Sequence, residues 1–184
     1  MKLIGNTAFI LMCSLALHGA FAPSASAASA RELDVRVDEA LEKFGTKVSG
    51  AEDVLSKARG VLVLPGVWKG GFGVGAEYGE GALLVNGAVQ EYYSVVGGSF
   101  GFQLGLQKHT LILCFMNDEV LNRFVSSDGW EFGVDGSAVL VEIGVDGRID
   151  SVSHNEPILV FALDPKGLMY NLNIEGYKFT KIKK

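Results

Sequence analysis

The sequence predicts an α+β fold, with N-terminal helices packed on a strongly curved antiparallel β-sheet or small β-barrel. Apolar residues recur at helical spacing before Gly60 and at every second position after it. Asn-Gly and Asp-Gly pairs separate the later apolar runs, as turns do in antiparallel hairpins. Glycine also repeats at alternate positions of two of these runs, which favours strong curvature of a sheet.

The helical part is expected over residues 30–59. Apolar side chains that share one helix face are Leu33, Val37, Leu41, Phe44 and Val48. We expect one helix that breaks near Gly50, then a shorter helix with Gly60 as its C-terminal cap.

The β part is expected over residues 60–184. Its turn signals are Asn86-Gly87, Asp128-Gly129, Asp135-Gly136, Asp146-Gly147 and the DPKG run at residues 164–167. Residues 117–124 interrupt the alternating pattern, and we expect a short helix there, capped by Asn117 or Asp118.

A glycine-rich stretch, GGFGVGAEY at residues 70–78, matches the dinucleotide fingerprint G-x-G-x-x-G/A over residues 71–76. That fingerprint requires a helix to begin here, but another strand and a hairpin turn follow. The stretch is therefore predicted to be a strand, with large residues on one face and glycines with Glu77 on the other. A glycine face, for instance at Gly73 or Gly101, permits close approach of another element.

The N-terminus has the pattern of a secretory signal peptide over residues 1–27. It carries Lys2, an apolar run and an A-x-A cleavage site ending at Ala27. A lipoprotein signal ending at Cys13 is disfavoured, because Met12 is bulky where a small residue is expected. The mature chain, residues 28–184, is predicted to be a single exported domain, periplasmic or secreted, with no transmembrane segment.

Charge and composition exclude several classes of function. Removing residues 1–27 takes away one of 16 basic residues and none of the 21 acidic ones, so the mature net charge is −6. Such an acidic chain is a poor nucleic-acid binder. Cys114 lies in an apolar run and is predicted to be a core residue. His109 and His154 lack partners at ligand spacing and are interpreted as loop residues, so no metal and no cofactor is expected.

A serine-hydrolase hypothesis arises from residues 97–101, GGSFG, which fit G-x-S-x-G. Asp150 and His154 follow Ser99 in the chain order of an α/β-hydrolase triad. That chemistry requires Ser99 on a strand-to-helix turn, but the strand pattern continues through it. No catalytic residue is therefore expected, and a serine hydrolase is the third-ranked function.

Several spaced motifs resemble the SYLF domain. They are KARGVLVLPGVWKGGFGVGAEYGEGALLV at residues 57–85, GGSFGFQLGLQ at 97–107 followed by an apolar run and FMND, FGVDGSAVL at 132–140, and GLMY at 167–170. The chain is identified by these motifs as a bacterial exported member of that family, over residues 40–184. Residues 139–144, VLVEIG, depart from the small-residue run that many members carry.

This resemblance implies a binding module. SYLF domains are associated with phosphoinositide-like or other acidic phospholipids and, in fungal members, with actin filaments. An exported protein meets no cytoplasmic actin, so anionic membrane lipids are the expected partners. The alternative is a structural or protein-interaction module of the cell envelope.

The candidate lipid-binding residues are Lys57, Arg59, Trp68 and Lys69. Three cations close in sequence attract anionic headgroups, and a tryptophan ring is suited to headgroup depth. Lysines matching Lys57 and Lys69 recur in the family motif. A second basic group is formed by Lys178, Lys181, Lys183 and Lys184. The alternative for both groups is that they are ordinary solvated charges.

Overall fold

The structure of the chain is a computed structural model that describes residues 29–141, 143, 147–149, 156–164, 167–168 and 174–184. Within these ranges, side chains are described except at residues 71–74, 99–106, 164 and 167–168. The predicted signal peptide, with its cut after Ala27 and the Cys13 alternative, lies outside the described residues and stays a prediction.

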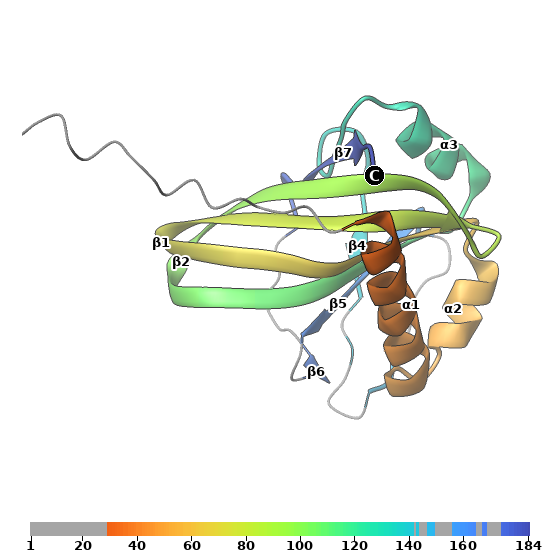
Figure 1. The fold of residues 1–184 in the computed structure, drawn as a ribbon, viewed down its shortest axis with the longest axis horizontal. Helices are drawn as coiled ribbons and strands as arrows, with labels where there is room; N and C mark the ends of the chain where they lie inside the picture. The colour runs from red at the N-terminus through yellow and green to blue at the C-terminus, as the bar shows by residue number, and fades with distance from the viewer. Residues whose placement is uncertain (1–28, 142, 144–146, 150–155, 165–166, 169–173) are drawn as a thin grey trace, which may run out of the picture.

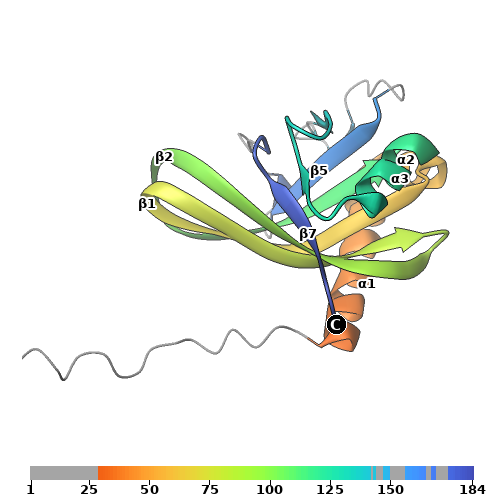
Figure 2. The ribbon, with the colours of Figure 1, turned by 90° about the horizontal axis from the view of Figure 1, so that it is seen from above.

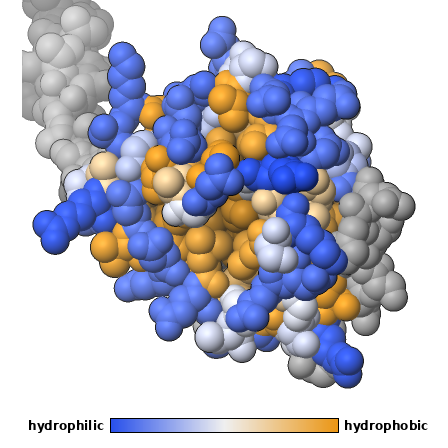
Figure 3. All heavy atoms as spheres, turned by 90° about the vertical axis from the view of Figure 1, so that its right-hand side faces the viewer, coloured by the Kyte–Doolittle hydropathy of each residue, from blue (hydrophilic) through white to orange (hydrophobic). Residues whose placement is uncertain are grey.

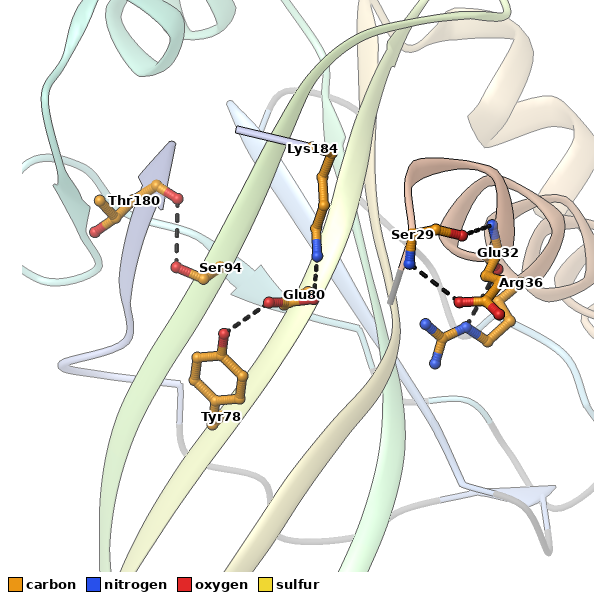
Figure 4. A network of polar contacts seen from close by, with 8 residues as sticks. All are labelled: Ser29, Glu32, Arg36, Tyr78, Glu80, Ser94, Thr180 and Lys184. Atoms are coloured by element: carbon orange, nitrogen blue, oxygen red, sulfur yellow. Dashed lines mark hydrogen bonds and ion pairs between the residues drawn. The ribbon is translucent and has the colours of Figure 1, made fainter. Parts of the chain in front are cut away.

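Two helices precede the sheet, as predicted. α1 spans Ala30–Lys47 and α2 spans Ala51–Lys57. A capping box begins α1: the Ser29 hydroxyl accepts from the backbone N–H of Glu32, and the Glu32 carboxylate accepts from the backbone N–H of Ser29 (Figure 4). Gly50, with φ of +93°, separates the two helices. Gly60 is not a helix cap, because α2 ends three residues earlier and Gly60 is the first residue of a strand.

The described strands form one seven-stranded sheet that is antiparallel except for the pair β4–β5. The strands are β1 Gly60–Val85, β2 Ala88–Phe115, β3 Trp130–Glu131, β4 Val139–Leu140, β5 Ile158–Asp164, β6 Gly167–Leu168 and β7 Lys178–Ile182. Asn86 and Gly87, both at positive φ, form the turn between β1 and β2. The predicted short helix is α3, Asp118–Ser126, capped by the Asn117 side chain. The α+β class with a curved, mainly antiparallel sheet is confirmed.

The long β1–β2 hairpin dominates the architecture. Its register runs from Val85↔Ala88 at the turn to Gly60↔Phe115 at the open end. One end of β2 pairs with β7 and the other end pairs with β5. Figures 1 and 2 show that the hairpin curls so strongly that its two ends lie on the same side of the molecule. The glycine-rich stretch at residues 71–76 lies within β1, as predicted, at the strongly curved part.

Glycines allow the two halves of β1 to touch. A Cβ added to Gly79 would lie 3.0 Å from the carbonyl oxygen of Gly66, and one added to Gly81 would overlap with the carbonyl oxygen of Val63. Side chains at these positions would therefore push the two halves apart. Gly73 and Gly101 are register partners. Their close packing stays a prediction, because the side chains around them lie outside the described ones.

The curled sheet has an apolar cluster on each face. On the face that α1 and α2 cover, here the α1 face, the cluster includes Phe44, Val54, Val63, Ala82, Leu84, Ile112, Cys114 and Phe161. On the opposite face, here the α3 face, it includes Leu64, Leu83, Tyr93, Val95, Leu111, Phe115, Val120, Phe124, Trp130 and Phe179. Burial raises the pKa of the Cys114 thiol to about 12, which confirms this residue as an inert part of the core.

The hairpin extends beyond α1 as a curved arm, which we define as residues 68–78 of β1 and 96–108 of β2 (Figure 1). The opposite end of the molecule carries α2, α3 and the turn of the hairpin. Seen from that end, apolar side chains gather in the middle of the surface and hydrophilic ones surround them (Figure 3). The arm thus projects from a body that is packed by helices on both faces of the sheet.

We expect Gly81→Ala to destabilise the fold by about 2–3 kcal/mol, because the added methyl group overlaps with the backbone of the other half of β1. Gly98→Ala is the matched control, since a Cβ added there meets nothing within 4 Å. Chemical denaturation of both variants measures the difference. Equal stability of the two variants would contradict the close contact between the two halves of β1.

Candidate functional site

The four predicted site residues occupy two separate places. Lys57 forms an exposed ion pair with Asp53 at 2.7 Å, one turn earlier in α2. Arg59 lies 3.8 Å from the Asp118 carboxylate at the start of α3. Trp68 follows Arg59 by nine residues of extended chain, a span of roughly 30 Å. Proximity in sequence therefore does not make one basic patch of these residues.

Trp68 and Lys69 point to opposite faces of the arm. Trp68 lies on the α1 face and is 47% exposed, and the Lys108 Nζ sits 5.3 Å from the centroid of its ring. Lys69 lies on the α3 face and is largely buried. The Trp68 ring is thus available at the surface, whereas the Lys69 side chain lies in the interior.

The C-terminal lysines do not form a single basic cluster either. Lys181 lies 3.8 Å from Glu91, and Lys184 lies 2.6 Å from Glu80. Figure 4 shows the Lys184 amine on Glu80, which also accepts a hydrogen bond from the Tyr78 hydroxyl. These contacts hold the C-terminal strand against the hairpin.

A buried polar cluster lies on the α3 face, where the two halves of β1 come together. Glu77 is 1% exposed, and the Lys69 Nζ lies 3.1 Å from its Oε1. The Tyr177 hydroxyl donates a short hydrogen bond to Oε2 of the same carboxylate. His109 Nε2 lies 3.9 Å from that oxygen. Although Oε1 makes an ion pair, it makes no hydrogen bond in the described structure, so Glu77 depends on Lys69 for compensation.

His109 is not the loop residue that the sequence indicated. It lies in β2 with 1% exposure, and neither ring nitrogen has a hydrogen-bond partner among the described residues. Burial lowers the pKa of His109, the Glu77 carboxylate works against that effect, and Lys69 adds to it. The imidazole is therefore held in its neutral form.

Tyr177 closes the cluster from the loop before β7. Its ring lies against Gly97, where an added Cβ would be 2.5 Å from the ring carbon Cε1. Burial and the hydrogen bond to Glu77 raise the pKa of Tyr177, so its hydroxyl stays a donor. The absence of a side chain at Gly97 is what allows this tyrosine to reach the carboxylate.

The hydrolase hypothesis finds no support in the position of Ser99. This residue lies within β2 as the register partner of Gly75, not on a strand-to-helix turn. The other two residues of that hypothesis, Asp150 and His154, lie outside the described residues. Within the described part of the chain, no group of His, Cys, Asp and Glu is arranged to hold a metal ion.

Exposed apolar side chains lie at several positions on the α1 face of the arm, and we call these residues together the arm face. Trp68, Tyr78 and Val96 are respectively 47%, 50% and 53% exposed, and Tyr78 and Val96 are cross-strand partners. Tyr78 and Val96 lie side by side, and exposed apolar side chains that lie together are typical of an interaction surface. The alternation of β1 predicted that Tyr78 and Glu77 face opposite ways, but not which face is exposed.

Comparison with known families gives a match to part of the chain. The family model described as "Ysc84: Las17-binding protein actin regulator" matches residues 96–184. The matched segment contains Val96 of the arm face together with His109 and Tyr177 of the buried cluster. No curated protein matches the chain. No helix in the described part of the chain is long and apolar enough to cross a membrane.

We expect Lys69→Gln to destabilise the fold by about 3 kcal/mol, because Glu77 then remains buried without its ion-pair partner. Lys57→Gln removes a lysine from an exposed pair and should change stability by less than about 0.5 kcal/mol. Urea unfolding of the two variants checks this. A small effect at Lys69 would mean that the buried carboxylate does not need this cation.

The lowered pKa of His109 makes stability depend on pH. In the unfolded chain a histidine binds a proton near its ordinary pKa of about 6.5, whereas the buried imidazole resists protonation. The free energy of unfolding should therefore fall as the pH drops below that value. His109→Gln should lose less stability than the wild type between neutral and mildly acidic pH. Parallel pH profiles from thermal unfolding would rule out a role for His109.

Proposed function

We propose that this chain, whose residues 96–184 match the Ysc84 (SYLF) family model, is a non-catalytic module that binds anionic lipid headgroups at a membrane surface. The observation that carries the proposal is the arm face. Trp68 and Tyr78 expose amphipathic rings on the same face of the sheet within a projecting hairpin, and such rings are suited to the boundary between headgroups and acyl chains.

Lys108 supplies charge to this face. It is the cross-strand partner of Trp68 and holds its amine over the indole ring. A basic residue near an anionic surface contributes about 1 kcal/mol, so one lysine requires help from the inserted rings. Lys57 and Arg59 are proposed as peripheral contacts, because both are exposed. Lys69 is proposed to act indirectly, through the stability of the arm.

The net charge of −5 on the full chain opposes attraction to anionic lipid. Binding must therefore come from a local surface and not from the field of the whole protein. We expect it to be weak, reversible and weakened by salt, because exposed charges are screened within about a Debye length.

The proposed setting is the cell envelope, which follows from the predicted signal peptide. In that setting acidic phospholipids are proposed as the partners and actin is not. The second candidate function is a protein-interaction module of the envelope. The same arm face favours it, because exposed aromatic and aliphatic side chains also bind protein surfaces.

Vesicles of phosphatidylcholine with phosphatidylglycerol test the proposal. Trp68 and Trp130 are the two tryptophans of the chain, and Trp130 is buried. The difference between the fluorescence emission spectra of the wild type and of Trp68→Phe therefore isolates the emission of Trp68. We expect this emission to shift to shorter wavelength when vesicles are added. The shift should be smaller at high salt. Trp68→Ala and Tyr78→Ala should each reduce sedimentation with vesicles several-fold.

Val134→Ser is the control, because Val134 is an apolar residue that is 74% exposed outside the arm. It should sediment like the wild type. If the wild type does not bind anionic vesicles, or if the arm-face variants sediment unchanged, the lipid assignment fails and the envelope interaction module takes its place.

A further inference from the structure

The buried ion pair of Lys69 and Glu77 has the composition of an amide bond plus one water molecule. The Lys69 Nζ lies 3.1 Å from Oε1 of Glu77, and the two side chains are respectively 17% and 1% exposed. Oε1 nevertheless accepts no hydrogen bond among the described residues. The fold thus holds a primary amine against a carboxyl group in a place from which most water is excluded.

Two further groups of the cluster lie around this carboxyl group. The Tyr177 hydroxyl donates a hydrogen bond to Oε2 of Glu77. His109 Nε2 lies 3.9 Å from the same oxygen, and the imidazole also interacts electrostatically with Lys69. Neither ring nitrogen has a hydrogen-bond partner in the described part of the chain. A neutral imidazole has one nitrogen that accepts a proton, so a donor and an acceptor of protons both stand beside the pair.

We propose that Lys69 and Glu77 react with each other in the folded protein and form an intramolecular amide bond. Burial of two charges is unfavourable even when they are paired, whereas an amide is neutral, so the reaction removes an unfavourable term from the folded state. Two groups that a structure holds in the right geometry react as if at concentrations of about 10⁵–10⁸ M. Both effects favour condensation in an interior that contains little water.

The step balances without another reactant. Within the ion pair one proton passes from Nζ to Oε1, which leaves a neutral amine and a neutral carboxylic acid. The Nζ lone pair attacks Cδ of Glu77, and the Tyr177 hydroxyl stabilises the negative charge that develops on Oε2. His109 accepts the proton that the nitrogen loses and returns it to Oε1. The bond between Cδ and Oε1 breaks, and Oε1 leaves as water.

The amide bond closes a ring across residues 69–77 and fixes the curl of the arm. Neither of the two cysteines lies in β1, so a disulfide cannot do the same for this strand. The inference goes beyond the proposed function, because it concerns the covalent structure of the arm and not its ligand. It is tested without vesicles, so failure of the lipid assignment leaves it standing.

Digestion of the full chain with trypsin, after incubation in the folded state and then unfolding, tests the bond by mass spectrometry. Trypsin cleaves after Arg59, Lys69 and Lys108, with no other site between the first and the last. An amide on the Lys69 Nζ blocks the middle site. The linked protein should therefore give one peptide, residues 60–108, that is lighter by one water molecule. Fragmentation of this peptide should place the link between Lys69 and Glu77.

Three variants separate the chemistry from the packing. Lys69→Arg keeps the positive charge but should give no link, because a guanidinium does not lose its proton in proteins. Tyr177→Phe and His109→Gln should each form the link about a hundredfold more slowly, because each loses a group that assists the reaction. The linked fraction is followed against time after cell-free synthesis. The melting temperature of each variant establishes that it is folded.

The matched control is the ion pair of Lys57 with Asp53. Its amine and carboxylate lie 2.7 Å apart, closer than those of Lys69 and Glu77, but both side chains are about half exposed. This pair should stay unlinked, so trypsin should cleave after Lys57.

Two results would overturn the inference. The first is that the folded wild type, after long incubation at neutral pH, gives only the peptides 60–69 and 70–108. The second is that Lys57 and Asp53 become linked to the same extent as Lys69 and Glu77, since the buried cluster would then play no part. If folded Tyr177→Phe and His109→Gln proteins both form the link at the rate of the wild type, the roles given to these two residues are wrong.

Discussion

The contact between the two halves of β1 is the constraint on which the rest of this structure depends. Gly79 and Gly81 let the backbone of one half lie against that of the other, so a single hairpin supplies both a curved sheet and its closure. Close approach also places Lys69 opposite Glu77, although seven residues of strand lie between them. The curvature and the buried charges are therefore two results of one backbone contact.

The buried cluster brings polar side chains from distant segments of the chain to one carboxylate, that of Glu77. Lys69 and Glu77 come from the two halves of β1, His109 comes from β2, and Tyr177 comes from the loop before β7. Burying a carboxylate is unfavourable unless it is compensated, so the cluster disfavours any packing that separates these segments. On the other side of the same sheet the arm face stays open, which leaves the interior rigid and the surface available for binding.

Local signals predicted much of the fold. The helix break at Gly50 and the cap at Asn117 depend on residues next to them in sequence, and both were predicted correctly. The burial of His109 was not, because it depends on packing against segments distant in the sequence, among them the one that carries Glu77, 32 residues away. Sequence also placed four candidate site residues together, whereas an extended strand separates Arg59 from Trp68. The burial of His109 and the separation of the site residues depend on tertiary packing, which the periodicity of apolar residues in the sequence does not encode.

The even spacing of Lys69 and Glu77 along β1 also determines which changes of chain length the arm tolerates. Both residues face the interior and Tyr78 faces outward, so the spacing between the two charges must remain even. Insertion or deletion of one residue would turn Glu77 to solvent and bring Tyr78 into the interior, unless a bulge absorbed the change. Two-residue changes preserve the faces. Length variation among natural versions of this arm should therefore occur in pairs.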